Sequence, residues 1–149
     1  MGCGNLIAGD DGLGLRVIQE LREFVSSDVD LVEGEVRGLD LLDYFMDIDK
    51  VIVVDAVTFG GNKGDCYRFE VEELKNMSRD SLISMHQLGI AEVVKIGSML
   101  YPDNISRKII LLGMEIEKVE NRFSMELSSE VEKAISSMVE LVLKELDEG

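Results

Sequence analysis

A continuous run of β-branched residues near the middle of the chain constrains its fold more than any other feature. Residues 51–56 read Val-Ile-Val-Val-Asp-Ala, and residues 108–113 contain a similar run, Ile-Ile-Leu-Leu-Gly. Runs that are apolar at nearly every position are typical of parallel strands whose two faces are both covered by helices. We therefore predict two buried parallel strands at these positions.

Weaker patterns around these runs predict the remaining elements. Residues 28–32, Asp-Val-Asp-Leu-Val, form a third short run that is interpreted as a buried strand. Residues 65–71 alternate polar and apolar positions after a glycine cluster at 60–64. The alternation predicts a half-exposed edge strand, because one of its faces meets solvent. Apolar residues at helical spacing predict helices over residues 13–25, over residues 39–46 and from Ser129 toward the end of the chain.

The order of these elements defines the fold class. Strands that alternate with helices along a chain form a mostly parallel sheet with helices on both faces. We therefore predict an α/β protein, a three-layer α/β/α sandwich with a mostly parallel twisted sheet. No repeat or linker divides the sequence, so residues 1–149 are expected to form a single domain.

One strand is missing from this pattern. Residues 2–14 read as a strand-to-helix turn, yet almost nothing precedes them to form the strand. We hypothesise that the natural start lies upstream and that a central first strand has been lost. A sheet without a gap beside residues 1–5 would contradict the hypothesis.

The charge of the chain restricts its partners. Thirty acidic residues against fifteen basic ones give a net charge of −15 and a pI near 4.3. Such a surface repels phosphate, so neither nucleic acid nor an anionic membrane is expected as a partner. A cation, or a partner with a basic or metal-containing surface, suits this charge better, although solubility alone explains most of the excess acid.

The sequence also indicates a compartment. No stretch reaches the roughly 18 apolar residues that a membrane span needs, and no basic segment followed by an apolar one marks a secretory signal. Cys3 and Cys66 are too few for a disulfide framework and lack CxxC spacing. We therefore predict a cytoplasmic protein.

The glycine-rich segment at residues 2–14 carries the first candidate site residue. It does not match GxGxxG, because the third glycine would fall at Ile7, and no GxxxxGK[ST] is present. Asp10 and Asp11 would also compete with a phosphate for the same helix amides. We therefore reject nucleotide binding and expect no organic cofactor. Either aspartate could cap the helix, and because Asp10 is the better cap, Asp11 remains the functional candidate.

Asp55 and His86 are the other two candidates. Asp55 ends a hydrophobic strand, and ligands of open α/β sheets bind beyond the carboxyl ends of strands; the alternative is a turn aspartate bonded to the amides of residues 56–59. His86 is the only histidine. Ser84 and Gln87 have capping-box spacing, which places His86 in the first turn of a helix, where the dipole favours the neutral, metal-binding imidazole. The alternative is an ordinary surface histidine.

One histidine and two carboxylates could form a divalent-metal site. Their separation in sequence leaves the geometry open, unlike HExxH or paired CxxC. From the residues alone, the chain is a metal-linked or carboxylate-based hydrolase, or a metal-binding module.

Three segments in order resemble the hydrogenase maturation protease family. They are Gly-Cys-Gly-Asn at residues 2–5 followed by Asp-Asp-Gly-Leu-Gly at 10–14, Val-Val-Asp-Ala at 53–56, and His-Gln-Leu-Gly at 86–89. The last segment is the most specific, and the resemblance covers nearly the whole chain. Within the family, the chain most resembles the branch that serves the coenzyme F420-reducing hydrogenases of methanogenic archaea.

This resemblance implies a function. Family members are endopeptidases that remove a short C-terminal extension from a nickel–iron hydrogenase large subunit once nickel has been installed. The resemblance places Asp11, Asp55 and His86 at the catalytic, metal-contacting positions, where the metal is the nickel of the substrate precursor. Activation of water by a carboxylate, as in an aspartyl endopeptidase, is consistent with these residues.

One departure and three alternatives accompany this prediction. Residues 33–38 read Glu-Gly-Glu-Val-Arg-Gly where the family usually carries a Gly-Gly-Thr type loop, which bears on substrate identity. The first alternative is a non-catalytic chaperone that binds the metal centre of the large-subunit precursor. The second is a zinc hydrolase that holds its own metal, and the third is a truncated, inactive relative.

Overall fold

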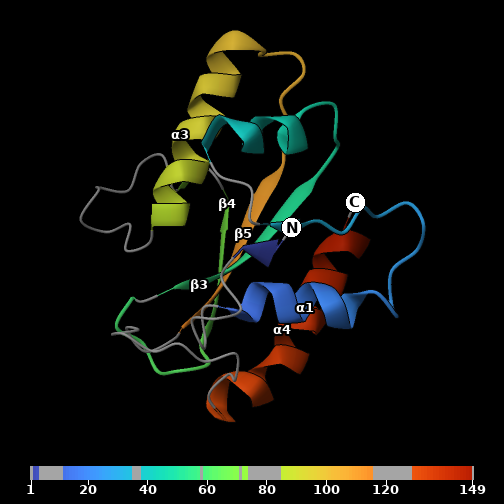
Figure 1. Ribbon diagram of the computed structural model, residues 1–149, viewed down its shortest axis with the longest axis vertical. Coiled ribbons are helices and arrows are strands. Elements are labelled where there is room, and N and C mark those ends of the chain that lie inside the picture. The colour runs from blue at the N-terminus through green and yellow to red at the C-terminus, as the bar shows by residue number, and fades with distance from the viewer. Residues whose placement is uncertain are drawn as a thin grey trace.

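The computed structural model describes residues 2–3, 12–34, 38–57, 59–70, 72–73, 85–115 and 129–148, and Figure 1 shows their arrangement. In chain order, the elements are β1 (Gly2–Cys3), α1 (Leu13–Leu21), β2 (Glu33–Gly34), the 3-10 helix η2 (Gly38–Phe45), β3 (Val51–Val57), β4 (Cys66–Glu70), α3 (Met85–Leu100), β5 (Ile109–Glu115) and α4 (Ser129–Asp147).

The described strands form one sheet in the order β2-β1-β3-β5-β4. All pairs are parallel except β4 with β5. β3 and β5 pair along their whole length, from Val51 opposite Ile109 to Val57 opposite Glu115, and every one of their residues is buried. The predicted parallel pair is therefore confirmed, as is the edge position of β4, whose residues are half-buried or exposed.

The amino-terminal part of the sheet differs from the prediction in two ways. The central position is occupied, because β1 lies between β2 and β3, with Gly2 opposite both Glu33 and Val54. The position beside residues 1–5 is therefore not empty, although the described part of the strand that occupies it has two residues and pairs with β3 at Gly2 alone. Residues 28–32 do not form a strand either. The described pairing of this part of the chain with β1 begins at Glu33, which lies opposite Gly2.

Two hydrophobic clusters place the helices in layers on the two faces of the sheet. Alternate residues of β3, Ile52 and Val54 among them, pack against α1 and α4. The intervening residues, including Val51 and Val53, pack against η2 and α3. In Figure 1, α1 and α4 lie on one side of the strands and α3 and η2 on the other. The structure is thus an α/β/α sandwich, as predicted.

The helix α1 is shorter than its apolar pattern suggests. Leu13, Val17 and Leu21 are buried at helical spacing, but Phe24 is 61% exposed. The amides of Phe24 and Val25 both donate to the Leu21 carbonyl, at 2.9 and 3.2 Å, which closes the helix in a turn. The last predicted helix begins at Ser129, as expected.

The direction of α3 matters for function because it fixes where the helix begins. Near its end, Gly97 lies so close to Leu42 and Ile105 that a Cβ would meet their side chains at 2.6 and 2.8 Å. Ile105 forms a bridge with Met46, and both residues precede buried strands, so this end of α3 lies at the amino edge of the sheet. In Figure 1, α3 runs opposite to β3 and β5. Its 16 residues, at about 1.5 Å each, therefore start toward the carboxyl edge.

A buried carboxylate joins α4 to the sheet. Glu145 is buried, lies 3.4 Å from the Lys50 ammonium and accepts hydrogen bonds from the Arg68 guanidinium. Lys50 also donates to the Glu145 carbonyl oxygen. The Arg68 guanidinium, aided by Lys50, holds the pKa of the Glu145 carboxyl below its ordinary value despite the opposing effect of burial.

This cluster makes part of the stability dependent on pH. Because the pKa of Glu145 is lower in the folded state, its contribution is fully present above the unfolded value, roughly 4.3, and is lost as pH falls through the folded value. We expect Glu145→Gln to lower the free energy of unfolding by about 1 kcal/mol at pH 7 and by less at pH 3. Urea unfolding of both proteins at the two pH values measures this difference, and a difference that grows on acidification would contradict it.

Candidate active site

Asp55 is a buried carboxylate inside the central strand. It is the fifth residue of β3, only 1% exposed, and its Oδ1 accepts a hydrogen bond from the Ala56 amide at 2.8 Å. The expectation that Asp55 ends the strand is wrong, because β3 continues to Val57, which pairs with Glu115. Side chains alternate along a strand, so Asp55 points to the same face as Val51 and Val53, the face covered by η2 and α3.

The position next to Asp55 carries no side chain. In the sheet register, Asp55 lies opposite Gly113, and Gly113 lies opposite Tyr67 of the edge strand. A Cβ at Gly113 would stand only 2.7 Å from a methyl carbon of Val57, so the packing requires glycine here. Gly113 therefore separates Asp55 from Tyr67 in the sheet without placing a side chain of its own between them on the face that α3 covers.

Glu115, which the sequence analysis did not single out, holds the loop that follows β3. This buried carboxylate accepts hydrogen bonds from three successive amides, of Phe59 at 3.0 Å, Gly60 at 2.7 Å and Gly61 at 3.0 Å. Gly60 has φ +87°, a conformation that favours glycine. The available signal was that Glu115, like Asp55, is a carboxylate attached to a buried apolar run.

Aromatic rings cover the sheet beside this loop. Phe59 packs edge-on against Tyr67 and Phe69, with ring centroids 5.1 and 5.5 Å apart, and the last two stack at 6.3 Å. Burial and the Glu115 carboxylate raise the pKa of the Tyr67 phenol, so the phenol remains protonated at neutral pH. Together these groups form a partly apolar wall on the edge-strand side of Asp55.

The cysteine of β4 does not have the properties of a nucleophile. Burial raises the pKa of the Cys66 thiol, and the nearby Asp65 carboxylate raises it further. Because the thiolate is the reactive form, a thiol held protonated at neutral pH is a poor nucleophile. The carboxylates are the better candidates for chemistry at this edge.

Asp11 and the His86 side chain lie outside the described residues, so their assigned roles stay predictions. Their neighbours in the chain are described. β1 ends at Cys3 and runs parallel to β3, so Cys3 lies toward the carboxyl edge of the sheet, and α1 begins at Leu13. The backbone of His86 is the second residue of α3, as the capping pattern predicted, and that helix starts toward the same edge. The described ends of β1 and α3 that lie nearest to these two residues in the chain are thus both toward the edge that holds Asp55.

The described residues do not form a complete metal site by themselves. No group of three metal-binding side chains occurs within the described ranges. Asp55 can supply one hard carboxylate ligand, but Glu115 is engaged by loop amides. Any metal contact therefore needs ligands beyond these two residues, either from this chain or from a bound substrate.

Among the described helices, none combines the length and apolar character required to cross a bilayer.

The fold and the residues at the carboxyl edge of the sheet together define an α/β/α protein with a carboxylate-bearing site on its central parallel strand. The family profile described as Hydrogenase maturation protease, HycI, matches residues 15–145. The chain therefore belongs to the hydrogenase maturation protease family.

Individual relatives agree with this assignment. The hydrogenase expression/formation protein HupD of Thiocapsa roseopersicina is 30% identical, over 98% of this chain and 66% of that protein. A putative hydrogenase maturation protease of Methanocaldococcus jannaschii is also 30% identical, over 98% of this chain and 94% of that protein. The chain thus spans just under two thirds of the length of HupD.

A solved structure shows the same fold. The hydrogenase maturating endopeptidase HybD from E. coli superposes with a TM-score of 0.78, covering 99% of this chain and 90% of that chain. The two sequences are 24% identical, so this likeness speaks for the architecture alone.

Proposed function

We propose that the chain is an endopeptidase that removes the C-terminal extension of a hydrogenase large-subunit precursor after nickel has been loaded. Family membership supports the substrate class. The observation that carries the proposal is the position of Asp55, a buried carboxylate on the central strand that faces the layer containing α3. The described ends of two further elements support it, because β1 ends at Cys3 toward the edge that holds Asp55 and α3 begins at Met85 toward the same edge.

In this proposal, Asp11, Asp55 and His86 contact the nickel of the precursor. Nickel is then part of the substrate and reports that assembly is complete. Carboxylates and a neutral imidazole are suitable ligands for such an ion. Asp55 is well suited to orient the metal or to accept a proton from the attacking water, because the buried strand fixes its position.

The proposal includes a cytoplasmic location and a single protein partner, the large-subunit precursor. Two cysteines without a disulfide framework suit a reducing compartment. The F420-reducing branch remains the sequence-based expectation for the identity of that subunit.

The direct test is to incubate the purified chain with nickel-loaded and nickel-free precursor and to record precursor masses. We expect the mass of the C-terminal extension to be lost from the loaded precursor only, because recognition requires the metal. The released peptide identifies the cleaved bond, and precursor incubated without the chain is the control.

The other outcomes select among the alternatives. Unchanged mass with retained binding of the loaded precursor would contradict proteolysis and favour a chaperone. Equal cleavage of both precursors, or of generic peptides, together with stoichiometric zinc in the purified chain would favour a hydrolase that holds its own metal.

A further inference from the structure

The outer surface of α3 changes from polar to apolar toward the carboxyl end of the helix. Its middle exposes charged side chains, whereas Ile96 is 38%, Met99 75% and Leu100 63% exposed. Tyr101, which follows the helix, is 46% exposed. Residues three and four positions apart lie on the same side of a helix, so Ile96, Met99 and Leu100 lie together. This group and Tyr101 are called the α3 end.

The backbone holds the α3 end firmly. Gly97, between the exposed residues, lies so close to Leu42 and Ile105 that a Cβ would meet their side chains. The Tyr101 amide donates to the Gly97 carbonyl at 2.7 Å, and the amides of Asn104 and Ile105 both donate to the Tyr101 carbonyl at 3.1 Å. The apolar side chains are therefore presented to solvent from a well-ordered turn.

The core does not need these side chains. The inward side of α3 packs with Ile90, Val93 and Val94 into the cluster that covers the sheet. Of the seven large apolar side chains that are exposed in the described part of the chain, four belong to the α3 end. Single exposed apolar residues are normal on protein surfaces, but residues gathered in a patch mark an interaction site.

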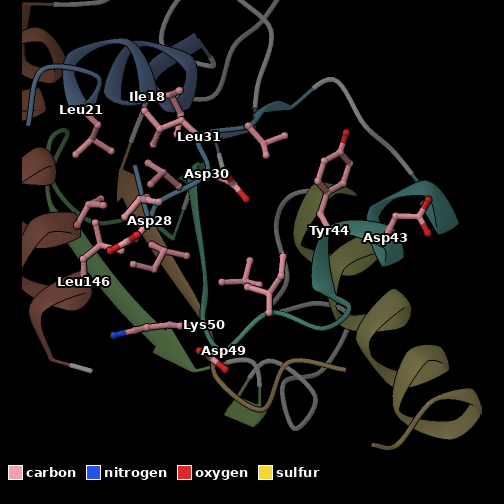
Figure 2. A pocket seen from close by; sticks show the side chains of 17 residues that line it. Ile18, Leu21, Asp28, Asp30, Leu31, Asp43, Tyr44, Asp49, Lys50 and Leu146 are labelled. Atoms are coloured by element: carbon pink, nitrogen blue, oxygen red, sulfur yellow. The ribbon is translucent and has the colours of Figure 1, made fainter. Parts of the chain in front are cut away.

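The surroundings of the α3 end are acidic. Five exposed aspartates belong to η2, to the segment after it and to the turn after α3, namely Asp40, Asp43, Asp47, Asp49 and Asp103. Figure 2 shows Asp43 on η2 and Asp49 just before β3. In residues 39–50 and 95–108, the exposed basic residues are Lys95 and Arg107. An apolar patch with an acidic rim suits a partner surface that is apolar with basic residues around it.

The α3 end lies away from Asp55. Because α3 starts toward the carboxyl edge of the sheet, its 16 residues, at about 1.5 Å each, place its end about 24 Å further along, at the amino edge. In Figure 1, α3 ends at the top of the view, beside η2. A partner that contacts both places must be about as wide, which fits a folded protein better than the few residues around a cleaved bond.

Charge selects among the possible occupants. A second copy of the chain would bring another net charge of −15 and the same exposed aspartates against this surface. Anionic lipid and nucleic acid would meet the same repulsion. A protein partner with basic residues would not.

We propose that the α3 end is a docking surface for the folded body of the large-subunit precursor, which presents there an apolar surface surrounded by basic residues. The inference rests on the proposed function, because that function supplies the partner. Docking at this distance from Asp55 lets the chain recognise the body of the subunit separately from its C-terminal extension.

Binding of the nickel-loaded precursor to the immobilised chain tests the docking surface. Met99→Gln combined with Leu100→Gln should raise the dissociation constant about tenfold, because two exposed anchors become polar while helix propensity is kept. The melting temperature should not change, because both side chains are exposed.

Phe24→Gln is the matched control. Phe24 is 61% exposed and follows α1, in the layer on the opposite face of the sheet. Its replacement should leave the dissociation constant within about twofold of the parent. An unchanged constant in the double variant, or an equal increase in Phe24→Gln, overturns the proposal.

A charge reversal tests the acidic rim. Asp103→Lys should weaken binding about two- to fivefold at low salt and by less at high salt, because exposed charges are screened. Glu140→Lys makes the same change on the exposed side of α4 and should have little effect. Equal effects of the two variants would show a dependence on total charge alone and contradict a basic partner surface at the α3 end.

Binding and cleavage are measured separately, so the two proposals fail in different ways. Precursor that binds through the α3 end without being cleaved would support the docking surface and contradict the proposed function. Precursor that is cleaved, with one dissociation constant for the parent and the double variant, would contradict the docking surface alone. Sedimentation of the chain alone tests the second copy. A monomer supports the proposal, whereas a dimer that the double variant converts to a monomer overturns it in favour of self-association.

Discussion

Asp55→Asn is expected to reduce cleavage of the nickel-loaded precursor at least about 100-fold while leaving the fold intact. Asparagine has nearly the same shape, and its amide oxygen can still accept from the Ala56 amide, which the Asp55 Oδ1 does at 2.8 Å. It cannot carry the negative charge that a metal ligand or a general base requires. The loss should therefore appear in the rate of precursor cleavage, measured by mass spectrometry, and not in the melting temperature.

Asp65→Asn is the matched control. Asp65 is an exposed carboxylate of the turn before β4, where its Oδ2 accepts from the Asn62 amide at 2.9 Å. The same chemical change there should leave cleavage within about twofold of the parent, because Asp65 is exposed and does not lie on the strand that carries Asp55. Cleavage by Asp55→Asn at a rate within threefold of the parent would remove Asp55 from the proposed site.

Glu115→Ala should have the largest effect on stability. The carboxylate accepts from the amides of Phe59, Gly60 and Gly61, and these three donors lose a charged acceptor together. Water can replace part of the loss, so we expect a decrease of about 3 kcal/mol in the free energy of unfolding. For a chain of this size, that corresponds to about 6–12 °C in melting temperature.

Hydrogen exchange separates this loop effect from a general loss of stability. In Glu115→Ala, the amides of residues 59–61 should exchange much faster, more so than amides of α4. Glu70→Ala is the control, because Glu70 is an exposed carboxylate of β4 whose ion pair with Arg68, at 3.6 Å, contributes little. Equal destabilisation by the two variants would show that the hydrogen bonds of Glu115 do not hold the loop.

The central strands could be predicted from sequence because their signal is local. A run that is apolar at every position needs cover on both faces, and β3 and β5 have it. Their ends were harder to place. Val57 and Glu115 extend both strands because they pair with each other. Pairing between residues so far apart in the chain cannot be predicted from the local sequence of either strand.

The amino-terminal region shows where local reasoning fails. Residues 28–32 were predicted as a strand from three apolar residues, but two of the five are aspartates, which strands disfavour. In the described part of the chain, β2 pairs with β1 from Glu33 onward. The same feature corrects the expectation of an empty central position. The two described residues of β1 join β2 to β3, and no composition argument could have shown this.

The site was predictable in part for related reasons. Asp55 was found because a single charge interrupts an apolar run, and a buried charge needs a purpose. Glu115 carries a similar signal, but its partners lie 54 to 56 residues away along the chain. Asp11 and the side chain of His86 lie outside the described residues, so their roles rest on the family resemblance and stay predictions.

The unequal lengths of the sheet pairings have a consequence for how the protein opens. Within the described part of the chain, β3, β5 and β4 are joined by five to seven residue pairs at each seam, whereas β1 meets β3 at one pair and β2 at two. Local openings follow the weakest connections in a native structure. The β1–β2 border should therefore separate from the β3–β5–β4 block at lower free energy than global unfolding.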